Sequence, residues 1–502
     1  MKKLNKIIAL ALVFFSAWSF FFIFSSSLVL IDGQRYFALF DDAMISMRYA
    51  WNFSHGDGLV WNIGEKIEGY TNFLWVMIMS IFTYLVNDKI QAVIAFHVFV
   101  FFLTILNLFL YLKVYKNYKE SSLIQVHEFV IISILILFYY PLTFWSLFGM
   151  EVSLIFTGLL SLFLLSEKHS FNKIQYLFIF IAFLFLLIRS DTLLYMIPFF
   201  IYRLVNYKSH FLIFAKEVLI IIILFLIYHA FRYDYYGYLF PNTYYLKMVG
   251  IPILFRLRDG IGYVYPYVLT TSPIIAFIIF SKFKFCKKTI LFISLFLISI
   301  VYQIYVGGDP WDHWRQLCFT LPFILLIMFK NLFKSKSKTK IYLSSLIVFI
   351  ILNWSFYEEL FLIKPPLHTI ENKLITNYVL AAKEVIEPSA SLAFVSSGTP
   401  AYYSDFYIID IFGKSDLHVA RLKPDLSGSI SWGRMRSVPG HNKYDLEYSL
   451  FSKNATFTQL LKLGNQDFNK GQHYVRIFYK GVPLWLQKDS PLVRWELLEN
   501  QE

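Results

Sequence analysis

The sequence is short of charge, of cysteine and of internal repeats. Only 16% of its 502 residues are Asp, Glu, Lys or Arg, whereas soluble domains average roughly a quarter. This shortage excludes an ordinary water-soluble protein, and the hydrophobic content of 57% predicts a polytopic α-helical membrane protein. The two cysteines are Cys286 and Cys318, and two thiols in so long a chain predict no disulfide framework.

The charge that is present is mostly basic and gives a net charge of +13. The basic residues occur in short tracts between apolar runs, as at 113–119, 282–288 and 330–340, and form no single patch. This distribution argues against a nucleic-acid partner and is typical of the cytoplasmic loops that orient a membrane protein. The N-terminal apolar run at 7–31 is too long for a signal-peptide core, so it predicts an uncleaved first span.

The basic tracts and apolar runs together predict a topology. They indicate about eleven spans, with the N-terminus in the cytoplasm and the C-terminus outside. The run at 73–86 is short and aromatic, which favours an interfacial or re-entrant helix on the outer face. Residues 1–356 then form a transmembrane domain, in which the outer loop 31–89 carries a pair of adjacent acids.

Residues 357–502 contain no apolar run of span length. The spacing of 371–387 predicts a helix, and 391–398 and 405–413 have the pattern of buried strands that end in glycine. We therefore expect a second domain of α/β architecture that lies outside the membrane.

Under this topology the unusual polar residues fall in several loops on the outer face. Charges at membrane depth are costly and usually face each other or a cavity, so the convergence of acids and bases predicts one site. The candidates are Asp41, Asp42, Arg48, Glu68, Asn72, Glu151, Arg189, Asp191, Asn242, Lys247, Asp309, His313 and Arg315.

The residue types indicate roles within that site. A carboxylate can act as general base on a hydroxyl within hydrogen-bond reach. Asp41 and Asp42 are neighbours, so their side chains point different ways, and one can face a substrate while the other holds the loop. Arg189, Lys247 and Arg315 are suited to neutralise a departing phosphate.

Structural alternatives remain open for several candidates. Asp41 and Asp42 can be an N-cap and a first-turn acid of a helix that begins there. Glu68 and Asn72 can form a capping arrangement before the run at 73–86. Arg189 and Asp191 can be a structural ion pair.

The sequence "DPWDH" at 309–313 has two interpretations. The first is a divalent metal site made by its two acids and His313. The second, which we favour, is a turn followed by a helix that starts at Trp311. No cofactor is certain, a divalent metal is possible, and the metal ligands are unknown.

The stretch "DDAMISMRYAWNFSHGDGLVWNIGEKIEGYTNFLW" at 41–75 resembles the first outer loop of GT-C class membrane glycosyltransferases. It looks most like the terminal arabinofuranosyltransferase-like family of mycobacterial cell walls, which has Gram-negative relatives. Further matches in the same order lie at 148–160, 189–195, 235–247, 306–316, 400–420 and 439–445, so the resemblance covers nearly the whole chain. The chain departs from the family in two places. It has Arg189-Ser190-Asp191 where relatives often carry Arg-Pro-Glu, and its stretch "GGDPWDHWRQ" differs from the corresponding stretch of the arabinosyl enzymes.

The resemblance implies an enzyme in the bacterial plasma (inner) membrane with a periplasmic C-terminal domain. It implies a polyprenyl-phosphate-linked sugar donor, with a pentofuranose such as arabinose as one candidate sugar, and a cell-envelope glycan or lipid acceptor. Asp41 is then the catalytic carboxylate, and His418 and His441 are expected to contact donor or acceptor. Membrane lipids are the other expected partners.

A transporter or flippase for a lipid-linked sugar is the alternative from another functional class. Transporters place ionisable groups near the bilayer midplane and often show repeats, whereas here the groups lie at loop edges and no repeat is visible. A scaffold subunit of an envelope complex is a third possibility if the acids prove dispensable.

Overall fold

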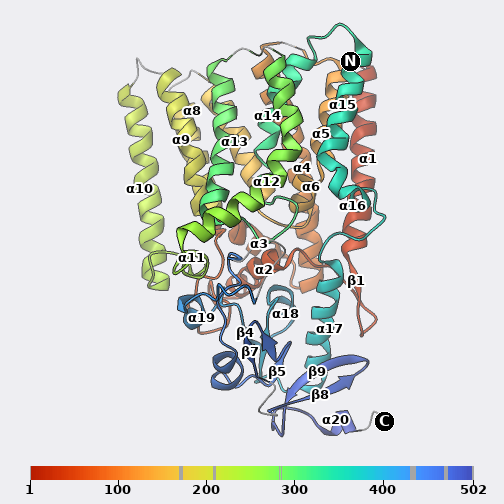
Figure 1. Cartoon of the computed structure of the whole chain (residues 1–502), viewed down its shortest axis with the longest axis vertical. Helices are drawn as coiled ribbons and strands as arrows, with labels where there is room; N and C mark the ends of the chain where they lie inside the picture. The colour runs from red at the N-terminus through yellow and green to blue at the C-terminus, as the bar shows by residue number, and fades with distance from the viewer. Residues whose placement is uncertain are drawn as a thin grey trace. The chain divides into compact units, whose positions relative to one another are not determined.

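The computed structural model describes residues 2–121, 123–168, 173–206, 211–281, 283, 285–429, 437–468 and 473–499. Most of these residues are helical (Figure 1). The chain divides into two compact units. The first unit comprises Met1–Phe24, His97–Phe231 and Gly260–Pro365, and the second comprises Ser25–Phe96, Arg232–Asp259 and Pro366–Glu502.

The described residues include six helices that are long and apolar enough to cross a membrane: Lys6–Ser26, Lys89–Lys119, Phe211–Tyr236, Ile253–Phe280, Lys287–Val306 and Lys338–Leu360. The pair Val126–Leu137 and Tyr140–Leu147, bent by 60°, makes a seventh if it is one broken span. Shorter apolar helices occupy Phe73–Leu85, Val152–Ser166, Lys173–Ile188 and Leu321–Leu332. The helical membrane character is thus confirmed, while the count of about eleven spans stays a prediction because these shorter helices fall below the span length.

The first unit is built from helices alone among its described residues. They are α1 (Lys2–Ser26), α4 (Lys89–Lys119), α5 (Val126–Leu137), α6 (Tyr140–Leu147), α7 (Val152–Ser166), α8 (Lys173–Ile188), the 3-10 helix η1 (Ser190–Thr192), α9 (Leu193–Asn206), α10 (Phe211–Tyr236), α12 (Ile253–Phe280), α13 (Lys287–Val306), α14 (Leu321–Leu332), α15 (Lys338–Asn353), η3 (Trp354–Phe356) and α16 (Tyr357–Leu360). The ends of α1, α4, α10 and α12 run into the second unit.

The second unit combines helices with a sheet. Its elements are β1 (Leu28–Val29), β2 (Arg35–Tyr36), α2 (Asp41–Ser54), α3 (Phe73–Leu85), α11 (Asn242–Met248), α17 (Thr369–Val385), β3 (Ser391–Phe394), α18 (Gly398–Tyr403), β4 (Tyr407–Asp410), α19 (Leu417–Arg421), the π-helix η4 (Glu447–Ser452), β5 (Phe457–Thr458), β6 (Lys462–Leu463), β7 (Gln466–Asp467), β8 (Tyr474–Tyr479), β9 (Val482–Gln487) and α20 (Glu496–Glu499). The helix predicted at 371–387 is α17, and the two predicted strands are β3 and β4 in shorter form.

The five-stranded sheet has the order β4-β3-β5-β9-β8. Strands β4, β3 and β5 are parallel, and β9 and β8 continue antiparallel. Phe394 at the end of β3 pairs with Asp410 at the end of β4, so the carboxyl ends of both strands lie at one edge. The core beneath them includes Ala393, Ile409 and Leu450. In parallel sheets this edge is where the connecting loops bring side chains together.

Candidate active site

Asp41 joins two parts of the second unit. It lies in the first turn of α2, whose N-cap position is Phe40 without a side-chain bond. The Asp41 carboxylate instead accepts a hydrogen bond from the backbone N–H of Thr399, at 3.0 Å, at the start of α18. A Cβ at Gly398 would fall 2.0 Å from the backbone oxygen of Asp41. The first-turn position is therefore confirmed, the N-cap alternative is wrong, and the close approach requires glycine.

A lysine and a third carboxylate lie at the same sheet edge. Asp410 ends β4, and its two carboxylate oxygens accept bonds from the N–H groups of Phe412, at 3.2 Å, and Ser415, at 3.0 Å. These bonds shape the loop that carries Lys414. The Lys414 ammonium donates to the Asp42 carboxylate at 2.6 Å. We call Asp41, Asp42, Asp410 and Lys414 the carboxylate–lysine cluster.

Burial governs the electrostatics of this cluster. It raises the pKa of Asp41 above its ordinary value, against the opposing effects of Lys414 and the Thr399 amide. It also raises the pKa of Asp410 to about 6. Burial alone would lower the pKa of Lys414, but Asp42, Asp41 and Asp410 together raise it. Carboxylates with raised pKa values beside a specific charge partner are typical of sites that move protons.

Asn242 brings α11 to the cluster. Its side-chain amide donates to the backbone carbonyls of Gly413, at 3.0 Å, Lys414, at 3.1 Å, and Asp416, at 2.9 Å. The predicted site residue therefore fixes the loop that carries Lys414.

Lys247 and His441 lie close to each other. The Lys247 side chain packs on Gly440, where a Cβ would fall 3.1 Å from its Cε. The His441 ring is buried, with Nδ1 3.2 Å from the carbonyl oxygen of Pro439. Burial, followed by the positive charges of Lys414 and Lys247, lowers the pKa of His441 to about 3. The imidazole is therefore neutral at physiological pH.

Arg48 and Asn72 make structural bonds within the second unit. The buried Arg48 guanidinium donates to the carbonyl oxygens of Trp61, at 3.1 Å, and Ser404, at 2.8 Å. Asn72 occupies the N-cap position of α3, but its side chain accepts from Ser46 at 3.0 Å and does not cap the helix. Both residues support the backbone around α2.

Glu68 is held by an ion pair with an arginine, and His418 contacts an aspartate. The buried Glu68 carboxylate accepts from Arg232 at 2.9 Å and 2.5 Å, so the capping alternative for Glu68 is wrong. His418 lies 3.2 Å from Asp445, and its side chain is 45% exposed. A pair so open to solvent contributes little stability.

The remaining candidates belong to the first unit, where acids and bases pair with each other. Arg189 donates to Asp191 at 2.9 Å and 2.8 Å and to Glu151 at 2.8 Å. This extends the predicted ion pair to three residues. Arg315 donates to Asp309 at 2.8 Å and 3.1 Å. Two of the three cations proposed for phosphate, Arg189 and Arg315, are thus bonded to carboxylates.

His313 has an unusual backbone and environment. Its buried ring is stacked with Phe144 and Phe356, with centroids 4.6 Å and 4.8 Å apart, and its Nε2 lies 3.3 Å from Glu359. The φ angles of His313 and Trp314 are 61° and 47°, which no α-helix accommodates.

The helix start predicted at Trp311 is consequently wrong, because turns run as far as Thr320 and α14 begins at Leu321. The turn that was predicted with it is present. Within the described part of the chain, no group of three or more His, Cys, Asp or Glu side chains could hold a metal ion.

Two residues of the cluster, Asp410 and Lys414, were missed by the sequence reasoning. The available signal was the run "YIIDIFGK" at 407–414, in which charged residues follow a buried strand directly. The predicted residues fall into both units, so their union in one site stays a prediction.

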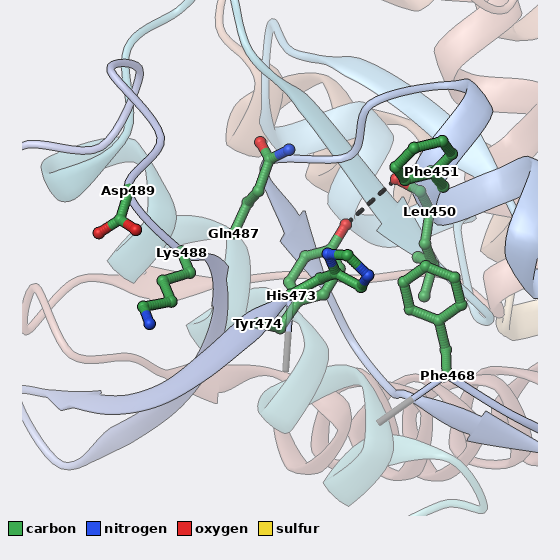
Figure 2. A pocket seen from close by; sticks show the side chains of 8 residues that line it. All are labelled: Leu450, Phe451, Phe468, His473, Tyr474, Gln487, Lys488 and Asp489. Carbon is green, nitrogen blue, oxygen red and sulfur yellow. Dashed lines mark hydrogen bonds between the residues drawn. The ribbon is translucent and has the colours of Figure 1, made fainter. Parts of the chain in front are cut away.

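A separate pocket of about 230 Å³ lies in the C-terminal part of the second unit (Figure 2). Its lining residues are Leu450, Phe451, Phe468, His473, Tyr474, Gln487, Lys488 and Asp489. The rings of Phe451, Phe468 and His473 gather on one side, and the Tyr474 hydroxyl donates to the Leu450 carbonyl at 3.2 Å. None of the predicted site residues lines it.

The fold defines a helical membrane protein with a buried carboxylate–lysine cluster in its second unit. Comparison with known families and with curated proteins finds no family and no curated protein that matches the chain. The resemblance described for 41–75 and the later segments therefore depends on those residues alone.

Proposed function

We propose that the chain is a GT-C-like glycosyltransferase of the bacterial inner membrane. It moves a sugar from a polyprenyl-phosphate-linked donor to a cell-envelope glycan or lipid acceptor. The observation that carries the proposal is the gathering of Asp41, Asp42 and Asp410 around Lys414 in a chain with several membrane-spanning helices. A buried carboxylate with a raised pKa is a better base for a hydroxyl than an ordinary one.

In the proposed reaction Asp41 accepts the proton of the acceptor hydroxyl. The acceptor oxygen forms a bond to the anomeric carbon, the bond from that carbon to the phosphate oxygen breaks, and polyprenyl phosphate leaves with the electron pair. Lys414 holds the Asp42 carboxylate, and Lys247 neutralises the leaving phosphate. Lys247 is assigned this role because it belongs to the same unit as the cluster, where its charge acts on His441 together with that of Lys414.

The proposal includes the finer topology that the sequence predicts. It has about eleven spans, a cytoplasmic N-terminus and a periplasmic domain at 357–502. The short apolar helices and the basic tracts between runs support it. The identity of the sugar, for which arabinofuranose is the candidate, is supported by the resemblance alone.

The test is sugar transfer in membranes that contain wild type, Asp41→Asn or Asp57→Asn. The donors are polyprenyl phosphates that carry a labelled pentose or hexose. An asparagine at 41 still accepts the Thr399 N–H bond, so the site keeps its shape while transfer falls by about 10²–10⁴-fold. Asp57 is an exposed acid of the same loop and serves as the matched control.

Two results would contradict the proposal. Unchanged transfer by Asp41→Asn would remove Asp41 as the base. Absence of transfer by wild type from every lipid donor, together with movement of the labelled lipid across the bilayer, would establish the flippase alternative.

A further inference from the structure

The segment formed by α11 and its flanks buries two polar residues and exposes several apolar ones. Asn242 and Thr243 are 3% and 8% exposed. The large exposed apolar side chains on α11 and its flanks are Leu239, Phe240, Tyr244, Val249, Ile253 and Leu254, with exposed fractions from 40% to 75%. A helix on the surface of a water-soluble protein has the reverse arrangement. The exposed apolar side chains of Tyr244 and of the residues that flank α11 therefore need an apolar neighbour.

The position of α11 in the chain identifies that neighbour as the bilayer. Residues 237–252 connect Phe211–Tyr236 to Ile253–Phe280, and both of these helices are long and apolar enough to cross a membrane. Only 11% and 28% of their apolar windows are buried by protein, so most of their surface is available to lipid. A short connection between two successive spans lies at the membrane surface, where tyrosine and apolar side chains concentrate.

The inward face of α11 contacts the loop that carries Lys414. Asn242 bonds three carbonyls of the 413–416 loop. Arg421 of α19 lies over the rings of Tyr238 and Tyr245, at 4.5 Å and 4.6 Å, and so contacts both α11 and the segment before it. Figure 1 shows α11 beside α19. One element thus faces both the bilayer and the cluster.

Lys247 places a positive charge near the end of α11. Lys247 packs on Gly440, and the charges of Lys247 and Lys414 both act on the neutral ring of His441. A lysine ammonium binds phosphate as a point charge. In α11, Lys247 follows the buried Leu246 and lies three residues after the exposed Tyr244.

We propose that α11 lies in the membrane interface and is the entrance for a lipid phosphate. Its exposed apolar face meets the hydrocarbon chain, and Lys247 binds the phosphate. The inference deepens the proposed function by assigning the binding site of the lipid carrier. It does not require that a sugar be transferred.

Spin-label accessibility in liposomes tests the membrane contact. Leu239→Cys, Tyr244→Cys and the control Asp57→Cys are labelled in a Cys286→Ser, Cys318→Ala background. We expect nitroxides at 239 and 244 to collide more with oxygen than with a water-soluble nickel complex, and the label at 57 to show the reverse. Equal exposure of 239 and 57 to nickel would overturn the placement of α11.

Binding of undecaprenyl phosphate and of inorganic phosphate to the purified full chain tests the phosphate contact. We expect Lys247→Met to weaken binding of both by about tenfold and Lys247→Arg to retain most of it. Leu239→Gln with Phe240→Gln should weaken only the lipid. Lys66→Met removes an exposed cation of the same unit and is the control.

Each outcome has a definite meaning. An unchanged affinity in Lys247→Met, or an equal loss in Lys66→Met, overturns the assignment of Lys247. Equal loss of both ligands in the Leu239/Phe240 variant overturns the lipid face. Because neither assay includes a sugar, a chain that binds undecaprenyl phosphate without transferase activity would refute the proposed function and leave this inference standing.

Discussion

Both units contain a group of buried acidic side chains around a basic one, but the two groups are arranged differently. In the first unit the Arg189 guanidinium donates hydrogen bonds to the carboxylates of Glu151 and Asp191, and its two terminal nitrogens each lie 2.8 Å from an oxygen. This length is typical of hydrogen bonds between charged groups. Although burial acts against it, Arg189 lowers the pKa of Asp191. In the second unit three carboxylates share one lysine, and burial raises the pKa of Asp410 to about 6.

This difference shows how the number and type of nearby cations determine whether a buried carboxyl group is ionised. A guanidinium supplies several donors in a fixed fork and keeps its acids ionised. A single ammonium among three carboxylates cannot satisfy them all, so one of the acids retains its proton more easily. The first arrangement is suited to holding helices together, and the second is suited to moving a proton.

The largest expected effect comes from removing the Arg189 side chain from its two carboxylates in the first unit. Arg189→Met leaves Glu151 and Asp191 buried without their cation, which should lower the free energy of unfolding by about 3–5 kcal/mol. Unfolding in mixed micelles with increasing SDS measures the change. Arg476→Met, at an exposed arginine, should alter stability by less than about 0.5 kcal/mol, and equal effects of the two variants would contradict a structural role for Arg189.

The second prediction concerns the pH dependence that only the second arrangement should produce. The pKa of Asp410 rises from 3.8 in the unfolded chain to about 6 in the folded protein. The folded state therefore binds more protons between these values, and stability falls as pH rises from about 4 to 6, by up to about 3 kcal/mol.

Unfolding of wild type and Asp410→Asn across this pH range measures that slope. The variant should show a shallower slope, because it has no carboxyl group to titrate. An equal slope in both proteins would show that Asp410 does not titrate there. Asp467→Asn, at an exposed acid of β7, should leave the slope unchanged.

The third prediction tests how tightly α2 and α18 are held together. In Gly398→Ala the new methyl group meets the backbone oxygen of Asp41, which should cost about 1–3 kcal/mol of stability. Transfer activity should fall with it, because Asp41 moves. Gly262→Ala has open space around its Cβ and lies within α12, where alanine is the better helix former, so it should be neutral or stabilising.

The smallest effect is expected at the exposed pair of His418 and Asp445. A double-mutant cycle with His418→Gln and Asp445→Asn should give a coupling energy below about 1 kcal/mol. A coupling energy several times larger would show that this pair behaves energetically like the buried pairs and not like a solvent-exposed one.

Local patterns predicted much of the fold. The periodicity of 371–387 and the apolar runs after it identified α17, β3 and β4. These elements were predictable because a helical face and a buried strand each produce a pattern within a short stretch of sequence. The pair Asp41 and Asp42 was placed correctly at a helix start. Asn242 was selected as a site residue and does contact the cluster, though by bonding the backbone of its loop.

What the sequence could not supply are contacts that depend on strand order. Asp410 and Lys414 join Asp41 only because β3 and β4 pair in parallel and share an edge, and no local pattern specifies that pairing. The start of α14 was misplaced for a different reason. His313 and Trp314 adopt positive φ angles, and neither is a residue type for which that conformation is expected.

The hydrogen bond between Asp41 and Thr399 spans 358 residues of sequence, and this separation has a consequence for biogenesis. Most of the chain is synthesised before α18 exists, so α2 and α11 are made before the elements that later hold them in place. Contacts of such high sequence separation form late and slowly. The carboxylate–lysine cluster is therefore completed only after the last quarter of the chain, which contains α18, Asp410 and Lys414, has been synthesised.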